Sequence, residues 1–268
     1  MLHSQVSTVN DVAAHPAGCY GRLAMSDDKA LDDRAMAALM GARGVDLWGA
    51  AAVRPDWPAA PDLPTAISFA LRLRPDSLDD LELGPNEAEV GEYRRVNDEL
   101  VEIGEACVAL LRAHGYRGER VDDDAPDGPL DPEIFASKTA ATQAGLGWIG
   151  KTALLVTPQF GASVRLGTVF TDLPLSTGTP VTTGRCGSCR ACVDACPVDA
   201  GRDVTWRAGL PRRVLYDCAA CDTHQLRFPE FDEICGICIW VCPWTRRAFR
   251  KEAGPPRVDR ATEKGDAP

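Results

Sequence analysis

Two runs of closely spaced cysteines in the last third of the chain restrict its fold more than any other feature. The first run, residues 186–197, reads CGSCRACVDACP and has the spacing C-x2-C-x2-C-x3-C-P. The second run, residues 235–243, reads CGICIWVCP and has the spacing C-x2-C-x3-C-P, so it lacks one upstream cysteine. Cys218 or Cys221 can supply that thiolate across an insertion. Together with Cys218 or Cys221, the two runs therefore provide two sets of four thiolate ligands.

The spacing of the first run is typical of bacterial proteins that hold two [4Fe-4S] clusters. Thiolates two residues apart on a tight loop can converge on three corners of one cubane, and the cysteine before the proline ligates the other cluster. Cluster 1 is therefore expected to be held by Cys186, Cys189, Cys192 and Cys242. Cluster 2 is expected to be held by Cys196, Cys218, Cys235 and Cys238, with Cys221 as the alternative to Cys218.

Zinc and disulfide bonds are the two other common uses of such cysteines. Structural zinc sites usually take two C-x2-C pairs, and a four-cysteine run that ends in proline fits that pattern poorly. A disulfide framework requires an oxidising compartment. The N-terminus shows no basic start followed by an apolar core, so we expect no export signal and a cytoplasmic protein. The sequence therefore predicts iron–sulfur clusters and electron transfer.

The length and composition of the chain predict a second domain upstream of the cysteines. The chain has 268 residues, too many for a cluster-binding domain alone, so the upstream part needs its own core. No apolar run approaches the ~20 residues of a membrane span. The net charge of −10 argues against a broad nucleic-acid surface. Basic stretches at residues 202–213 and 246–251 are interpreted as solvated surface charge, with a local nucleic-acid-binding patch as the alternative.

Hydrophobic periodicity before residue 172 predicts alternating helices and strands. Expected helices are one that starts at an N-cap near Ser26 and ends at Gly41–Gly44, one over 87–114 and one over 133–143. Expected strands span 45–53, 65–73, 116–121, 153–157 and 164–171, the last two joined by a turn at 158–161. This alternation is typical of an α/β domain.

Changes in composition divide the chain into four predicted segments. Residues 1–24 are expected to be a disordered extension, and residues 25–175 the α/β domain. Residues 176–250 are expected to hold the two clusters, and the charged, proline-containing residues 251–268 to be a disordered tail.

The segment GLGWIGKT, residues 145–152, matches two phosphate-binding patterns, G-x-G-x-x-G and G-x-x-x-x-G-K-T. Both patterns need a preceding strand and a following helix, whose N-terminus binds the phosphate. Here a helix is expected before the motif and a strand after it, so we predict a tight turn that lets a flat ligand approach the backbone. The predicted binding residues are Gly145, Leu146, Gly147, Trp148, Gly150 and Lys151. A purely structural turn is the alternative.

Several segments together resemble the epoxyqueuosine reductase family. They are the glycine turn with its preceding alanine (144–151), the segment LGTVFTDLP (166–174), and the cysteine segments 186–197 and 238–244. The resemblance covers the organisation of residues 30 to about 250 and is most specific between 144 and 244. It implies an α+β protein: a nitroreductase-like α/β domain that binds cobalamin, followed by a ferredoxin-like domain with two [4Fe-4S] clusters.

The resemblance also implies a mechanism. In that family, electrons pass singly through the clusters to cobalamin, which supports removal of an oxygen or another leaving group while an acidic side chain donates a proton. A low-potential donor such as a ferredoxin or flavodoxin is implied. Counting back from the glycine turn places the family's acidic residue at Asp131, although the surrounding segment does not reproduce the motif. Asp122, Asp123 and Asp124, which follow an expected strand, are the alternatives.

Two further expectations concern the substrate and the metal ligands. The family's tRNA-processing members carry a helical-repeat extension after the clusters, whereas this sequence ends soon after them, so a small-molecule substrate is expected, with tRNA as the alternative. The rival interpretation is an electron carrier or reductive activator that serves a partner protein and binds no corrinoid. The motif of His-ligated cobalamin proteins is absent, and His224 is expected at the surface or beside a metal ligand rather than on a metal.

Overall fold

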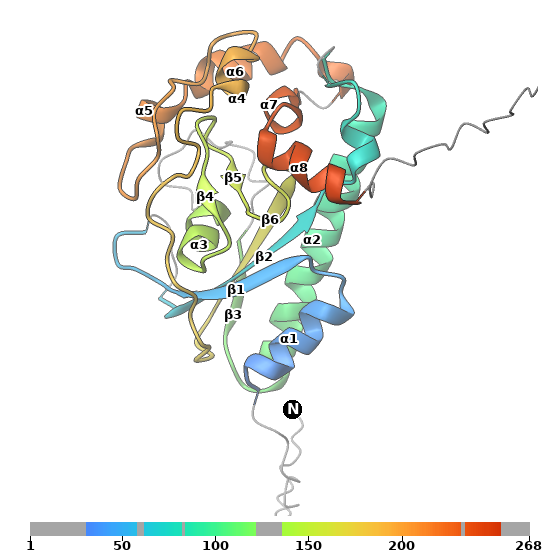
Figure 1. Ribbon diagram of the computed structural model, residues 1–268. Coiled ribbons are helices and arrows are strands. Elements are labelled where there is room, and N and C mark those ends of the chain that lie inside the picture. Colours follow the sequence, from blue (N-terminus) through green and yellow to red (C-terminus); the bar gives the residue numbers. More distant parts are fainter. Residues whose placement is uncertain (1–30, 58–61, 82–83, 122–135, 232–233, 253–268) are drawn as a thin grey trace, which may run out of the picture. The chain divides into compact units, whose positions relative to one another are not determined.

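A four-stranded antiparallel sheet organises the N-terminal part of the chain (Figure 1). The computed structural model describes residues 31–57, 62–81, 84–121, 136–231 and 234–252. The strands, in their order across the sheet, are β1 (Leu47–Ala52), β2 (Thr65–Arg72), β6 (Val164–Thr171) and β3 (Gly118–Arg120). Each neighbouring pair is antiparallel, and β2 pairs with β6 from Thr65 opposite Thr171 to Arg72 opposite Val164.

Helices cover both faces of this sheet, which explains why β2 is buried at every position except its last. Successive side chains of β2 point to opposite faces. Ile67, Phe69 and Leu71 pack in the same core as the apolar stripe of α2 (Glu87–Ala113) and as α1 (Asp33–Ala42). Ala66 packs in a second core with α3 (Ser137–Gln143). The sheet therefore separates α1 and α2 from α3.

The two longer helices begin at side-chain caps. Asn86 Oδ1 accepts the backbone N–H of Glu89 at 2.9 Å and starts α2, and Asp32 Oδ1 accepts that of Ala35 at 2.9 Å and starts α1. The cap of the first helix is thus Asp32; the predicted cap near Ser26 lies outside the described residues. Cys107, on the apolar stripe of α2, is fully buried, as expected for a core residue.

The cysteine-rich part contains short helices joined by loops, packed beside the small hairpin of β4 (Trp148–Ile149) and β5 (Leu155–Val156). Its elements are α4 (Ala191–Asp194), α5 (Arg212–Leu215), α6 (Cys218–Gln225), η3 (Pro229–Phe231), α7 (Ile237–Trp240) and α8 (Pro243–Glu252). A further 3-10 turn, η1 (Pro75–Leu78), follows β2.

One buried contact connects the loop before β6 to α8. The backbone N–H of Ala162 donates to the hydroxyl of Thr245 at 3.0 Å, and both residues are buried. The neighbouring Gly161 has a φ of +62°, and a Cβ atom there would overlap the backbone of Thr245. Glycine is therefore required at this position for both conformational and steric reasons.

Two predictions about the upstream part need correction. The alternation of helices and strands predicted an α/β domain, but the sheet is antiparallel, because β1, β2, β6 and β3 are joined as antiparallel neighbours rather than by parallel crossovers. The strand predicted at 153–157 is shorter and pairs with β4 rather than with β6, since the turn at Thr157–Gly161 leads away from the hairpin.

The remaining segment boundaries stay predictions. The described residues from Leu31 onward form one compact unit. The tails predicted to be disordered lie outside the described residues. Within the described part of the chain, no helix combines the length and apolar character needed to cross a membrane.

Candidate functional site

The four cysteines predicted for cluster 1 interact with one another. Burial, and then the charges of Cys242, Cys186 and Cys189, raise the pKa of the Cys192 thiol to about 11. The backbone N–H of Cys189 donates to the carbonyl of Cys186 at 3.0 Å and closes the tight loop. Cys242 stands immediately before α8 and brings the second run to the first. Each iron of a cubane takes one thiolate, and this group provides four.

A second group of thiols forms around Cys196. Burial, and then the charge of Cys196 among others, raises the pKa values of Cys221 and Cys235. The pKa of Cys238 is raised by burial and by the charges of Cys192, of the first group, and of Cys235 and Cys221. The backbone N–H of Ala200 donates to Cys196 Sγ at 3.3 Å. This group combines the last cysteine of the first run with two cysteines of the second run and one from α6.

Cys218 and Cys221 differ in their surroundings. Cys218 is the first residue of α6, and Cys221 follows one turn later. The Tyr216 hydroxyl hydrogen-bonds to Cys221, and the charge of Cys221 acts on Cys235 and Cys238. Cys218 acts on Cys221 but is not among the main causes of the shifts at Cys235 and Cys238. Both cysteines line the same cavity.

The cysteines of the second group line a cavity of about 480 Å³. Its wall includes Cys196, Cys218, Cys221, Cys235 and Cys238. His224 also lines it; this side chain is only 9% exposed, and its ring stacks edge-on against Phe228 with centroids 5.2 Å apart. His224 therefore lies beside the predicted ligands rather than at the surface. Within the described residues, no group of three His, Cys, Asp or Glu side chains is arranged around a single metal ion.

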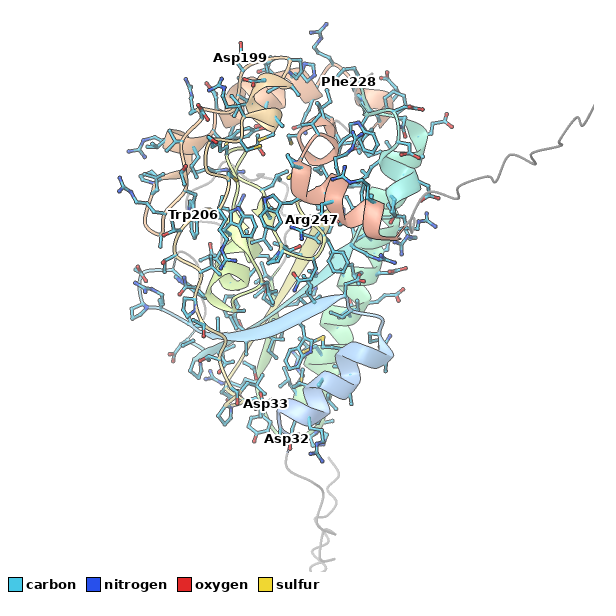
Figure 2. All side chains as sticks on the ribbon, viewed as in Figure 1. Asp32, Asp33, Asp199, Trp206, Phe228 and Arg247 are labelled. Carbon is cyan, nitrogen blue, oxygen red and sulfur yellow. The ribbon has the colours of Figure 1, made fainter. Side chains whose placement is uncertain are left out.

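A larger cavity of about 990 Å³ lies next to the first. Its apolar wall includes Trp57, Ile149, Trp206, Leu210 and Leu215, and Trp206 packs beside α3 (Figure 2). Its polar wall includes Lys138, Thr139, Thr142 and Gln143 of α3. Arg54, Arg202, Arg212 and Arg213 add positive charge. A flat, polar-edged molecule matches such a mixture of aromatic rings and hydrogen-bonding groups.

The two cavities meet at a shared wall. Residues that line both are Lys138, Ala153, Arg212, Tyr216 and Cys218. Tyr216 is therefore in contact with the larger cavity on one side and hydrogen-bonded to Cys221 on the other. Because these residues line both cavities, the cavity of the second thiol group adjoins the larger cavity.

The predicted binding residues of the glycine turn are not in the wall of the larger cavity. The residues of this region that line it are Ile149, within the turn, and Ala153, directly after it. The turn follows α3 and leads into the β4–β5 hairpin, so a helix precedes it and a strand follows it, in the predicted order. At Gly147 a Cβ atom would overlap the carbonyl of Val156, so glycine permits the close packing of the hairpin.

Lys151, from the same turn, is buried and points to the first cysteine loop. Its ammonium is 4% exposed and lies 2.6 Å from Asp203 Oδ1. Asp203 also forms an ion pair with Arg190, which stands between Cys189 and Cys192. The charges of Lys151 and Arg190 hold the pKa of Asp203 below its usual value. Lys151 is thus committed to an ion pair that joins the glycine turn to the predicted cluster 1 loop.

Trp148 of the glycine turn packs against two of the cysteines predicted for cluster 1. Its side chain is fully buried in a core that includes Cys242 and, partly buried, Cys186. Its ring meets Trp244 edge-on with centroids 4.9 Å apart. Its Nε1 atom is buried and has no hydrogen-bond partner among the described residues. A buried indole N–H normally finds an acceptor, and the thiolates and sulfides of a cluster are acceptors of that kind.

Sequence reasoning missed several of these residues. Glu89 reads as a solvated residue in the first turn of α2, yet it is 5% exposed and lines the smaller cavity. Burial raises its pKa to about 7. The basic stretch 202–213 was interpreted as solvated charge, but Arg202, Arg212 and Arg213 line the larger cavity. The only sequence signal for this was that Arg212 and Arg213 lie a few residues before Cys218.

The predicted proton donors lie outside the described residues. They are Asp131 and its alternatives Asp122, Asp123 and Asp124. Two carboxylates in the wall of the larger cavity are described, and both are paired: Asp56 with Arg54 at 2.9 Å and Asp217 with Arg202 at 2.6 Å. The hydrogen bond from Arg54 lowers the pKa of Asp56, which makes this group a poor acid at neutral pH.

Comparison with solved structures defines the structural class. A catabolic reductive dehalogenase superposes on 79% of this chain with a TM-score of 0.65 at 21% identity, using 32% of its own length. The epoxyqueuosine reductase of Streptococcus thermophilus covers 79% of this chain with a TM-score of 0.50 at 17% identity, using 65% of its own length. The mixed helix and sheet fold is thus the one found in reductive dehalogenases and epoxyqueuosine reductases.

Sequence comparison gives the nearer relationship. An epoxyqueuosine reductase of Synechococcus sp. (strain CC9605) is 34% identical over 175 residues, 61% of this chain and 50% of the relative. That of Atelocyanobacterium thalassa is 32% identical over 150 residues, 51% of this chain and 44% of the relative. No protein-family model matches the chain. The chain is thus similar in sequence to epoxyqueuosine reductases, and it spans about half the length of the curated relatives that it matches.

Proposed function

We propose that this chain is an iron–sulfur reductase that passes electrons through two [4Fe-4S] clusters to a corrinoid in the larger cavity. The corrinoid supplies the chemistry for reductive removal of oxygen or another leaving group from a substrate. The observation that carries this proposal is the shared wall between the cavity of the second thiol group and the cavity of about 990 Å³. An electron carrier that only docks to a partner needs no such cavity.

The thiols fit two clusters. We assign Cys186, Cys189, Cys192 and Cys242 to cluster 1 and Cys196, Cys235 and Cys238 to cluster 2, with Cys218 or Cys221 as its fourth ligand. We propose a cytoplasmic location, where a reducing environment keeps cysteines free to bind iron. Burial of Cys192 and Cys238 disfavours their free thiolates, and iron binding would offset that cost.

The larger cavity fits a corrinoid in size and in chemistry. Its volume of about 990 Å³ is at the upper end of the usual ~300–1,000 Å³ of ligand pockets. Trp57 and Trp206 offer apolar faces for a flat macrocycle, while Thr139, Thr142 and Gln143 offer hydrogen bonds to its amide-bearing edge. The protein's role in this arrangement is to bind and orient the cofactor beside Tyr216 and to exclude water from it.

The acid that protonates the leaving group is proposed to be Asp131, or one of Asp122, Asp123 and Asp124, because the described carboxylates Asp56 and Asp217 are held in ion pairs. A related epoxyqueuosine reductase from Bacillus subtilis has an aspartate on a catalytic loop that can swing out of its active site. That precedent supports an acid on a loop rather than on the rigid cavity wall.

The substrate is proposed to be a small molecule that carries an epoxide, a halide or a similar leaving group. One relative has been solved with a modified tRNA stem loop and another with a bromohydroxybenzoic acid, so both substrate classes have a precedent on this fold. The net charge of −10 disfavours a long RNA contact in this chain. A ferredoxin or flavodoxin is the proposed source of electrons.

The test is a titration of the anaerobically reconstituted protein with cob(II)alamin, followed by electron paramagnetic resonance. Iron and sulfide are counted first, and eight of each are expected for two clusters. A changed cobalt spectrum that saturates at one equivalent supports the proposal. Intact clusters with an unchanged cobalt spectrum would instead support the rival function, an electron carrier for a partner enzyme.

A pair of variants locates the corrinoid. Ala208→Trp adds a large side chain to the wall of the larger cavity and is expected to weaken corrinoid binding at least tenfold. Ala37→Trp makes the same change on the exposed face of α1 and is expected to leave corrinoid affinity unaltered. Equal affinities in the two variants would place the corrinoid elsewhere.

A further inference from the structure

The exposed face of α8 carries positive charge directly beside cluster 1. Arg246 and Arg247 are adjacent and exposed, and the exposed Arg250 follows them by four and three residues, so the three lie on one side of the helix, whereas Thr245 and Ala248 on the other side are buried. The helix begins at the proline that follows Cys242. Arg185, which precedes Cys186, is exposed as well. We call these four arginines the α8 patch.

Aromatic rings hold the α8 patch against the cluster loops. The Arg246 guanidinium lies 4.2 Å from the ring centroid of Trp240, which stands between Cys238 and Cys242. Arg247, labelled in Figure 2, lies 6.0 Å from the ring centroid of Trp244. Arg185 lies 5.5 Å from that of Trp148, whose ring meets Trp244. The patch is therefore continuous from the first cysteine loop to α8.

The charges of the α8 patch are not neutralised by described neighbours. Several other described arginines form ion pairs, for example Arg190 with Asp194 and Arg202 with Asp217. No described carboxylate lies within ion-pairing distance of any of the four patch arginines. In a chain of net charge −10, this unpaired positive surface requires an explanation.

We propose that the α8 patch is the docking surface for an acidic electron-transfer protein of the flavodoxin or ferredoxin class, with cluster 1 as the entry point for its electrons. This inference rests on the proposed two-cluster function. One electron leaves the reduced donor and reduces cluster 1 from its 2+ to its 1+ state, and no proton or other group is transferred. Cluster 2, which adjoins the larger cavity, then receives the electron.

Simple electrostatics explain why such a patch is needed. An acidic donor is repelled by a chain of net charge −10 as a whole. At physiological ionic strength, however, the Debye length is about 8 Å, so charges close to the contact dominate over distant ones. Four unpaired arginines around Cys186 and Cys242 therefore attract the donor to the point where the cluster is nearest. Charge complementarity of this kind raises association rates more than affinity.

RNA is the other polyanion that could meet an arginine surface, and the position of the patch disfavours it. An RNA substrate must reach the larger cavity, and none of the residues that line this cavity belongs to α8 or to the first cysteine loop. The patch is on the side of cluster 1, whereas the cavity adjoins cluster 2. A partner that only delivers electrons matches that position.

The experiment measures cluster reduction in the holoenzyme by stopped flow, with a reduced acidic flavodoxin as the probe. The test variant is Arg246→Glu with Arg247→Glu. The control variant is Arg34→Glu with Arg112→Glu, which makes the same change in net charge on α1 and in the last turn of α2, away from α8 in Figure 1. Reduced methyl viologen, a small cation, serves as a reductant that needs no docking surface.

The test variant is expected to lower the second-order rate constant with flavodoxin about ten- to a hundredfold at low salt. That loss should shrink as salt is added, and the control variant should keep the wild-type rate. Reduction by methyl viologen and the iron content should remain unchanged in both variants. Equal rates for the two variants with flavodoxin would overturn the docking surface.

Two further outcomes are decisive. If RNA binding, measured with a tRNA stem loop, is lost in the test variant while the flavodoxin rate is kept, the patch is an RNA surface and the inference is wrong. If the wild-type protein binds no iron, or if methyl viologen fails to reduce it, the two-cluster function itself fails. The readout therefore separates failure of the patch from failure of the proposed function.

Discussion

At the scale of single residues, the fourth ligand of cluster 2 illustrates what spacing can and cannot determine. The cysteine runs fix seven of the eight proposed ligands, because each run is a local loop of fixed geometry. Cys218 and Cys221 are one helical turn apart on α6, and spacing alone favours neither. The contact of Cys221 with Tyr216 and its interaction with Cys235 and Cys238 distinguish the two only once the chain is folded.

We therefore expect Cys221→Ala to lose cluster 2 and Cys218→Ala to keep both clusters. Cys221→Ala removes the thiol that interacts with Cys196, Cys235 and Cys238, and should lower iron and sulfide from about eight to about four per chain. Iron and sulfide analysis of both reconstituted variants is the measurement. Loss of iron in the Cys218 variant, with full iron in the Cys221 variant, would restore the sequence-based assignment.

The buried indole of Trp148 leads to a second prediction at this scale. A hydrogen bond from Nε1 to cluster 1 would stabilise the reduced, more negative cluster. Trp148→Phe keeps most of the ring and removes the donor, so the reduction potential of cluster 1 should fall by about 40 mV, the equivalent of one hydrogen bond of ~1 kcal/mol in a one-electron couple. A redox titration followed by electron paramagnetic resonance measures this shift.

Trp57→Phe is the matched control, because Trp57 lines the larger cavity rather than the cluster 1 loops. Its effect on the potential of cluster 1 should be small. If Trp148→Phe leaves the potential unchanged while its iron content is normal, the buried N–H has another acceptor.

At the scale of elements, the sequence predicted long helices and buried strands well and pairing poorly. The period of apolar residues in α2 and the continuous apolar run in β2 depend only on local burial, so both elements are close to their predicted bounds. Strand direction and partner depend on distant contacts, such as that of β6 with both β2 and β3. The large cavity was missed for the same reason, since its wall combines segments far apart in sequence.

The contact between Ala162 and Thr245 gives a prediction about how α8 is held. Thr245→Val removes the hydroxyl that accepts the buried N–H of Ala162 and leaves that donor without a partner. The free energy of unfolding should fall by about 1–3 kcal/mol. Chemical denaturation of the reconstituted protein, monitored by circular dichroism, measures the change. Thr245→Ser keeps the hydroxyl, so its free energy of unfolding should fall clearly less. An equal fall in both variants would show that the hydroxyl is not the cause.

At the scale of the whole molecule, one buried carboxyl is expected to shape stability against pH. Glu89 is 5% exposed, its Oε2 atom has no partner among the described residues, and burial raises its pKa from 4.5 to about 7. Since the folded state holds this proton more tightly than the unfolded state, the associated stability is complete below pH 4.5 and declines as the pH rises to about 7. A pKa shift of this size corresponds to roughly 3 kcal/mol in the free energy of unfolding.

Glu89→Gln keeps the shape of the side chain and removes its charge. The variant should therefore be more stable than the wild type at pH 8, by up to roughly 3 kcal/mol, and the two should converge as the pH falls below 4.5. Urea denaturation across this range measures the difference. Because Glu89 lies against the loop of Gly236 and not in the larger cavity, corrinoid binding should be unaffected. A constant stability difference at all pH values would mean that Glu89 does not change its ionisation in this range, and that its burial is offset by contacts with the cluster 2 loop.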